Sequence, residues 1–116
     1  MGIFSRFIGA DGENQATLYL KKEHYKILER NYKTYYGEVD IIAKKGDLLV
    51  FVEVKKRKND KVGKPEEYVS SLKRKKILFA AKNYMYYNDL VDANCRFDVI
   101  SILGEEITHI QNAFEP

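Results

Sequence analysis

Two short apolar segments, each interrupted by a carboxylate, constrain this chain more than any other feature. The segments are 37–42 (Gly-Glu-Val-Asp-Ile-Ile) and 50–55 (Val-Phe-Val-Glu-Val-Lys), and Lys-Gly-Asp at 45–47 lies between them. Short β-branched runs on either side of a glycine-containing turn predict two adjacent strands. Asp40 then lies inside one strand and Glu53 inside the next, where burying an unpaired carboxylate is costly. Both acids therefore need a partner.

A divalent cation is one partner that fits. Residues two apart on a strand share a face, so Glu53 and Lys55 are expected to point the same way. Carboxylate oxygens of Asp40 and Glu53 suit Mg²⁺ or Mn²⁺. Such a metal polarises a phosphate and lowers the pKa of a bound water, and the Lys55 ammonium would orient that water or stabilise developing negative charge. The pattern therefore favours phosphodiester hydrolysis.

The alternative is an ion pair between neighbouring strands. The spacing D-x(12)-E-x-K is short, and many unrelated chains match it. What favours the metal site is that the two parts of the pattern fall on strands predicted to be adjacent.

Positive charge is concentrated in one part of the chain. From Lys55 to Lys82 there are eleven of the twenty basic residues and three of the seventeen acidic ones, a surplus of eight positive charges. A basic surface beside a carboxylate site is suited to a polyanion, although a solvated helix face and loop would look the same. The candidate nucleic-acid contacts are Lys56, Arg57, Lys58, Lys61, Lys64, Arg74 and Lys76.

Two further residues are candidates for supporting roles. Glu38 precedes Asp40 by two positions and is expected on the same face of the strand. Lys73 falls on the apolar face of a predicted helix, one turn before Ile77. It either extends to the edge of that face or reaches the carboxylates.

Other polar and aromatic residues have simpler explanations. Asp98 shares a strand face with Arg96, which predicts a structural role, either as an ion pair or through a hydrogen bond to a neighbouring loop. The tyrosines before Gly37 are expected either to stack on bases or to cover the edge of the core. They are Tyr32, Tyr35 and Tyr36.

The chain is expected to form a single domain over residues 1–116, in the order helix-strand-strand-strand-helix-strand-strand. The predicted helices are 11–22 and 65–87, and the predicted strands are 25–30, 38–44, 48–57, 96–103 and 107–112. Segments 31–36 and 58–64 are predicted loops. The long second helix is expected to cross over, so that the fourth strand runs parallel to an earlier one. This gives an α/β fold with a mixed central sheet.

Cysteine and apolar content suggest the compartment. Cys95 is the only cysteine, which excludes an intramolecular disulfide and fits the cytoplasm. No apolar run is long enough for a membrane span, and the first residues lack the pattern of a signal peptide. His24 and His109 are far apart and have no cysteine partners, which argues against zinc.

Taken together, these motifs resemble the YraN-like uncharacterised family over nearly the whole chain. The matching positions are Gly12-Glu13, Ala16, Tyr19-Leu20, Ile27-Leu28, Asn31, residues 37–43 and 51–55, Arg57, Lys73, Ala80 or Ala81, and residues 96–99. The motifs at 37–43 and 51–55 are the specific ones. That family is similar to the restriction-endonuclease-like PD-(D/E)xK superfamily and, within it, to archaeal Holliday-junction resolvases.

The resemblance implies a three-layer sandwich with Asp40, Glu53 and Lys55 as the catalytic core. It also implies Glu13, from the first helix, as a further metal ligand, and Mg²⁺ or Mn²⁺ as cofactor. The implied partner is nucleic acid, above all DNA in branched or flapped form. A homodimer would match the two-fold symmetry of a junction. The other hypotheses are a non-catalytic nucleic-acid-binding module on the same fold and a protein-interaction domain.

Overall fold

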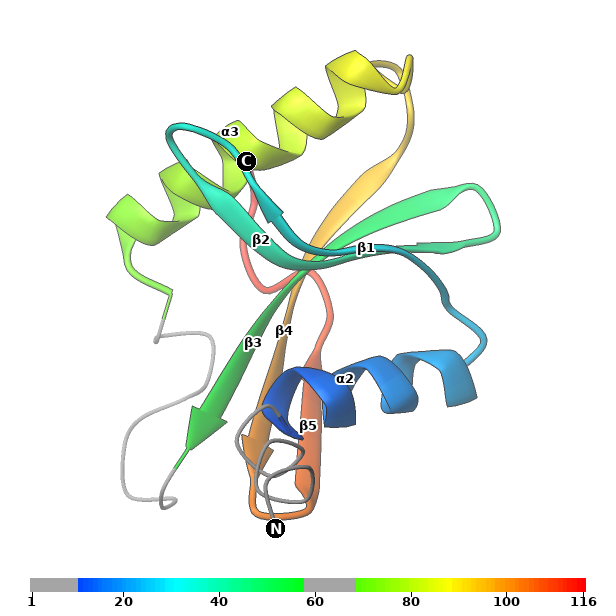
Figure 1. The fold of residues 1–116 in the computed structure, drawn as a ribbon, viewed down its shortest axis with the longest axis vertical. Helices are drawn as coiled ribbons and strands as arrows, with labels where there is room; N and C mark the ends of the chain where they lie inside the picture. Colours follow the sequence, from blue (N-terminus) through cyan, green and yellow to red (C-terminus); the bar gives the residue numbers. More distant parts are fainter. Residues whose placement is uncertain (1–10, 58–68) are drawn as a thin grey trace, which may run out of the picture.

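The structure is a computed structural model that describes residues 11–57 and 69–116 (Figure 1). Its elements are α2 (Asp11–Lys22), β1 (Lys26–Lys33), β2 (Glu38–Lys45), β3 (Leu48–Arg57), α3 (Ser71–Tyr87), β4 (Cys95–Leu103) and β5 (Glu106–Ile110). The predicted order of helices and strands is confirmed. No helix in these two ranges is long and apolar enough to span a membrane.

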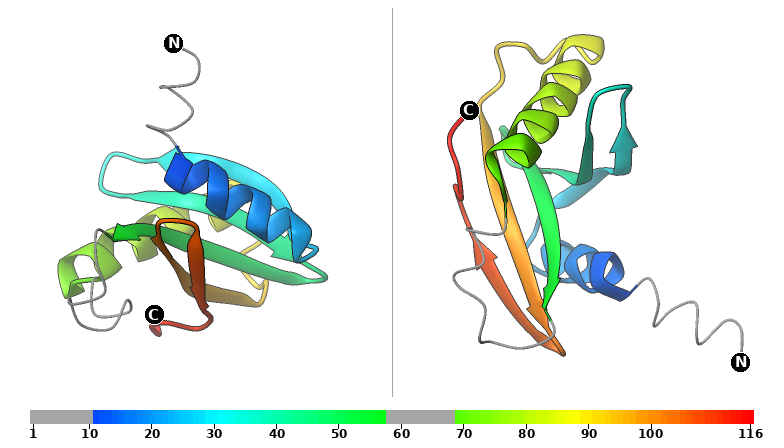
Figure 2. Two further views of the ribbon diagram at one scale, coloured as in Figure 1. Left: turned by 90° about the horizontal axis from the view of Figure 1, so that it is seen from below. Right: turned by 90° about the vertical axis from the view of Figure 1, so that its left-hand side faces the viewer.

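The sheet has the order β1-β2-β3-β4-β5. The β1–β2, β2–β3 and β4–β5 pairs are antiparallel, and β3 pairs with β4 in parallel. The predicted crossover is therefore correct, because α3 lies between the two parallel strands β3 and β4 in the chain. The helices α2 and α3 cover opposite faces of this mixed sheet, which gives three layers (Figure 1 and Figure 2).

Alternation along β3 builds a separate core on each face of the sheet. Leu49 and Phe51 pack with α3, whereas Val50 and Val52 pack with α2. All four side chains are buried. This explains why β3 is a continuous apolar run, as is usual for a strand covered on both faces. The alternation also sends Glu53 to the α3 face.

The start of α3 differs from the prediction. The predicted start at Pro65 lies outside the described residues, but Val69 and Ser70 precede the helix and are not part of it. Ser70 is the N-cap, with extended backbone angles, and its side chain accepts a hydrogen bond from the backbone N–H of Lys73 at 3.2 Å. A serine hydroxyl satisfies an N–H that has no partner inside the helix.

The β1–β2 hairpin bends at Asn31 and Asp40. Val39 packs on the α3 side while Ile41 packs on the α2 side, although strict alternation would place both on one face. Asn31, on the neighbouring strand, has a positive φ of 54°, which asparagine tolerates better than most residues. The prediction of a loop over 31–36 is therefore wrong for 31–33, which continue β1.

The bend brings the hairpin turn against α3, as the right-hand view of Figure 2 shows. In the turn, the Thr34 hydroxyl accepts a hydrogen bond from the Gly37 N–H at 3.0 Å, and the Thr34 N–H donates to the Gly37 carbonyl at 2.8 Å. A Cβ at Gly37 would overlap the backbone carbonyl of Lys76. Glycine is therefore required by the closeness of the two backbones.

We expect Gly37→Ala to lower the free energy of unfolding by about 1–3 kcal/mol, because neither backbone can easily move apart. Gly12→Ala is the matched control. Its Cβ would meet only Lys56 Cδ, at an ordinary 3.7 Å. Urea denaturation followed by circular dichroism measures both variants. Equal stability of the two variants would contradict this account of the turn.

Asp98 is the centre of a buried polar network. It accepts two hydrogen bonds from the Arg96 guanidinium at 2.8 Å each, and one from the Asn112 N–H at 3.0 Å. It also pairs with Nε2 of His109 at 2.7 Å. Burial alone would raise the pKa of Asp98, but the bonds to His109, Arg96 and Asn112 lower it. The predicted structural ion pair with Arg96 is confirmed, and the role of His109 was missed.

We expect Asp98→Asn to destabilise the protein by about 3 kcal/mol or more, because it leaves the Arg96 charge without its partner in a largely buried place. Asp92→Asn, at an exposed position, is the control and should change stability by under about 0.5 kcal/mol. Thermal and urea unfolding would measure the difference. A neutral Asp98→Asn would mean that the network contributes little.

Candidate functional site

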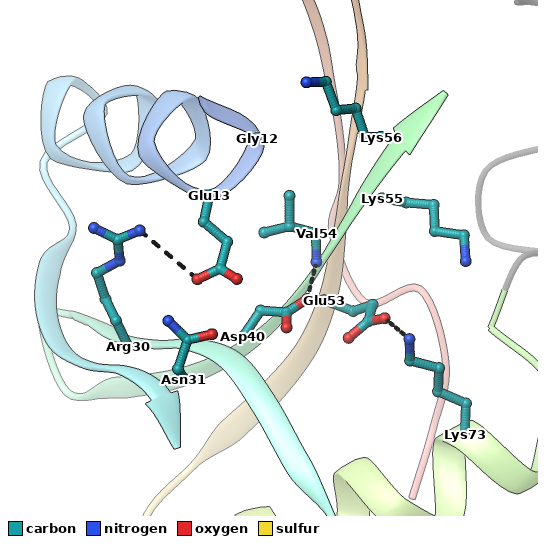
Figure 3. Close-up of a pocket in the computed structure, with 10 residues that line it drawn as sticks. All are labelled: Gly12, Glu13, Arg30, Asn31, Asp40, Glu53, Val54, Lys55, Lys56 and Lys73. Carbon is teal, nitrogen blue, oxygen red and sulfur yellow. Dashed lines mark hydrogen bonds and ion pairs between the residues drawn. The ribbon is translucent and has the colours of Figure 1, made fainter. Parts of the chain in front are cut away.

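A polar pocket lies between α2, β1, the ends of β2 and β3, and the first turn of α3 (Figure 3). We call it the carboxylate pocket. It is lined by Gly12, Glu13, Arg30, Asn31, Asp40, Glu53, Val54, Lys55, Lys56 and Lys73. The fold thus brings together the residues that were predicted for the site from separate parts of the chain. They are Asp40, Glu53 and Lys55 from the strands, Glu13 from α2 and Lys73 from α3.

Asp40 lies where β2 and β3 separate. The last paired residues in the ladder are Ile41 and Val52. Beyond them, the Asp40 carboxylate accepts a hydrogen bond from the backbone N–H of Val54 at 2.8 Å. The side chain therefore takes the place of a strand–strand hydrogen bond and satisfies a donor that the separation leaves unpaired. The same bond fixes the direction of the carboxylate.

Glu53 is the buried acid of the pocket, with 4% of its side chain exposed. The Lys73 ammonium pairs with it at 2.5 Å. Burial, and next the nearby Asp40 charge, raise the pKa of Glu53 to about 7, although Lys73 opposes this rise. The hydrogen bond to Glu53 in turn raises the pKa of Lys73. Glu53 therefore changes its charge near neutral pH.

Glu13 approaches the same place from α2, as Figure 3 shows. Burial and then the Asp40 charge raise its pKa, while Arg30, 3.7 Å away, acts in the opposite direction. Its Oε1 atom is buried and lies 3.7 Å from the Arg30 guanidinium, which is an ion-pair distance but too long for a hydrogen bond. A buried carboxylate oxygen with only this long ion pair, beside another acid, is an atom to which a water or a cation can bind.

The pocket residues fit a magnesium-like ion that is held by two carboxylates and otherwise by water or substrate. Within residues 11–57 and 69–116, no three acidic, histidine or cysteine side chains are grouped closely enough to enclose a metal. Asp40 and Glu53 remain as a pair of oxygen donors. Mg²⁺ is commonly bound by one or two carboxylates, with waters and substrate phosphates completing its octahedron. The donor set suits that mode and does not suit a closed protein cage.

Lysines border the pocket. Lys55 is half-buried and extends to the same side of β3 as Glu53 and Lys73 (Figure 3), as the alternation predicted. Lys56 is exposed and points to the other side. Two positions were predicted for Lys73, at the edge of the apolar helix face or at the carboxylates. In the structure it reaches the carboxylates.

The other predicted residues are not in the pocket. Glu38 and Lys76 line a neighbouring hollow. Arg57 is half-buried at the end of β3. Arg74 donates from Nε to the Val69 carbonyl at 2.9 Å and lies over the Phe114 ring, so it supports the C-terminal segment. The candidates Lys58, Lys61 and Lys64 lie outside the described residues.

Sequence reasoning gave no role to Arg30 or Asn31, yet both line the pocket. Asn31 belongs to one of the motifs that carry the family resemblance, and this was the only sign of its role in the sequence. No sign of a role for Arg30 was present in the sequence, because its place beside Glu13 follows from how α2 packs on β1.

The raised pKa of Glu53 predicts how stability depends on pH. The folded state holds this proton more tightly than the unfolded state, where the pKa is about 4.5. Its contribution is therefore complete below pH 4.5 and is lost as the pH rises through about 7. We expect the wild type to lose up to about 3 kcal/mol more than Glu53→Gln between pH 4.5 and 8. Urea denaturation at both pH values measures this, and parallel curves would contradict it.

Comparison with known proteins identifies relatives along the whole chain. It is 41% identical to a UPF0102 protein of Persephonella marina over 113 residues, covering 97% of both chains. It is 44% identical to one of Geobacter metallireducens, covering 99% of this chain and 98% of the relative. It is 50% identical to one of Clostridioides difficile, covering 91% and 95%.

A profile described as "Uncharacterised protein family UPF0102" matches residues 12–102. That range contains Glu13, Asp40, Glu53, Lys55 and Lys73, which are the acids and two of the lysines of the pocket. These matches confirm the resemblance to the YraN-like family, and the chain belongs to the uncharacterised protein family UPF0102.

Proposed function

We propose that this protein is a Mg²⁺- or Mn²⁺-dependent nuclease that cleaves phosphodiester bonds in DNA, branched or flapped DNA in particular. The observation that carries the proposal is the convergence of Asp40, Glu53 and Glu13 from two strands and a helix, beside the lysines of the pocket. Such a cluster stores repulsion between like charges, which a bound cation relieves.

Each pocket residue has a role in this proposal. Asp40 and Glu53 hold the metal, and Glu13 supplies a further oxygen through a water molecule. When bound, the metal activates a water and stabilises charge on the phosphate. Lys55 orients that water or stabilises negative charge in the transition state. Lys56 and Arg57 bind the nucleic-acid backbone on the way to the pocket, and such contacts make binding sensitive to salt.

Lys73 completes the charge balance. Its ammonium lies on the Glu53 carboxylate, where it favours the ionised form that a metal needs. With a metal on Glu53, the Lys73 ammonium would be available to pair with the phosphate. Lys73 is thus a positioning residue for Glu53.

Cleavage assays on single-stranded, duplex, flap and four-way-junction DNA test the proposal, with Mg²⁺, Mn²⁺ or EDTA. We expect metal-dependent cutting by the wild type and a loss of about 100-fold or more in Asp40→Asn and Lys55→Met. Lys75→Met is the control, because it removes an equal charge from an exposed position on α3 that does not line the pocket. Cutting that persists in EDTA or in Asp40→Asn would overturn the proposal.

A non-catalytic nucleic-acid-binding module is the second candidate. The Glu53–Lys73 ion pair favours it, because Lys73 already neutralises the buried acid without any metal. This candidate requires salt-sensitive DNA binding that needs no metal and is unchanged in Lys55→Met. A homodimer, which the resolvase resemblance implies, belongs to the nuclease proposal. Sedimentation that shows only monomer at high micromolar concentration would count against a resolvase.

A further inference from the structure

Three aromatic side chains are exposed together next to the carboxylate pocket. Tyr35 and Tyr36 lie in the β1–β2 turn, and Phe79 lies on α3. Their exposed fractions are 91%, 64% and 43%. Isolated exposed aromatics are ordinary, but a contiguous group on a protein surface commonly marks a binding site.

The rings form a continuous group. The centroids of Tyr35 and Tyr36 are 4.7 Å apart, and those of Tyr36 and Phe79 are 5.2 Å apart, both nearly edge to face. The turn that carries the tyrosines is fixed by the Thr34–Gly37 hydrogen bonds and by the contact of Gly37 with the α3 backbone. The group is therefore held in place on two rigid elements. Tyr32, by contrast, packs against Tyr84 and donates to Asn83, so it covers the core edge.

The same turn borders a hollow of about 440 Å³, a size typical of small-ligand sites. We call it the aromatic hollow. It is lined by Lys33, Thr34, Tyr35, Tyr36, Gly37, Glu38 and Lys76. Two ammonium groups against one carboxylate leave it net positive. Aromatic faces combined with lysines are what single-stranded nucleic acid binds, since bases stack on the rings and phosphates pair with the cations.

The aromatic hollow is close to the carboxylate pocket. Glu38 of the hollow and Asp40 of the pocket are two residues apart on β2, a distance of about 7 Å along a strand. Lys76 and Lys73 are three residues apart on α3, about 4.5 Å along the helix axis. Bases in one strand of a duplex are spaced by about 3.4 Å. One strand can therefore pass from the hollow to the pocket within a few nucleotides.

We propose that the aromatic hollow binds unpaired bases of a single-stranded segment, with Lys33 and Lys76 on its phosphates. The inferred substrate is DNA that has a single-stranded stretch beside the cleaved bond, as in a flap. The placement of the cut rests on the proposed nuclease function, whereas binding of unpaired bases does not. In a duplex the faces of the bases are covered by stacking, so they cannot stack on the aromatic rings of the hollow.

The test is binding, in EDTA, of a single-stranded oligonucleotide that carries 2-aminopurine, whose fluorescence falls on stacking. The wild type should quench it and bind it more tightly than the matched duplex. Tyr35→Ala should weaken single-strand binding about 5- to 100-fold and abolish the quenching. Tyr35→Phe keeps a ring and should stay within about twofold of the wild type. Tyr87→Ala removes another exposed tyrosine, one that does not line the hollow, and should also stay within twofold.

Three results would overturn this proposal. The first is equal affinity for single strand and duplex. The second is unchanged binding and quenching in Tyr35→Ala. The third is a dimer in sedimentation that Tyr35→Ala converts to monomer while DNA binding stays unchanged, which would make the surface an interface between two copies.

The two proposals fail separately. Ring-dependent binding without metal-dependent cutting would support the aromatic hollow and refute the nuclease. The converse result is cutting that is lost in Asp40→Asn while remaining unchanged in Tyr35→Ala and equal on single-stranded and duplex DNA. That result would support the nuclease proposal and refute base binding by the aromatic hollow.

Discussion

The hydrogen bond from the Val54 N–H to Asp40 joins the fold to its polar pocket. Two strands that separate inside a sheet leave backbone donors without partners, and such donors are costly when partly buried. Here a carboxylate accepts one of them at 2.8 Å. The separation opens space for the pocket, and the bond that stabilises the separation also aims Asp40 into it. The hairpin bend at Asn31 and Asp40 is part of the same local geometry.

The electrostatics of the pocket follow from that opening. Glu53 continues the apolar alternation of β3 and is therefore carried into a buried position next to Asp40. Burial and like charge favour its protonated form, and Lys73 favours the ionised form. These opposing effects place the pKa of Glu53 near neutrality. In this structure the ionised form of Glu53 is paired with the Lys73 ammonium, and in the proposed function a divalent cation would compete for the same carboxylate.

The aromatic hollow and the carboxylate pocket are both consequences of how the β1–β2 hairpin meets α3. The turn approaches the helix so closely that only glycine fits at position 37. That contact places Tyr36 against Phe79, while Lys73, six residues before Phe79 on α3, reaches Glu53. A single helix thus contributes to both features, and their spacing is fixed by the helical rise. Shifts of this helix would change the two sites together.

The sequence alone determined the order of elements, the crossover and the face on which Glu53 and Lys55 lie, because these follow from local periodicity and short turns. It also indicated Asp40 and Glu53, since carboxylates within apolar strands stand out, whereas Glu13 was implied only by the family resemblance. Only the tertiary structure decided that Lys73 pairs with Glu53, that Arg30 meets Glu13, that His109 joins Asp98, and that Asn31–Lys33 extend a strand. These contacts join segments far apart in the chain or depend on a bend, and no local pattern encodes how separate elements pack.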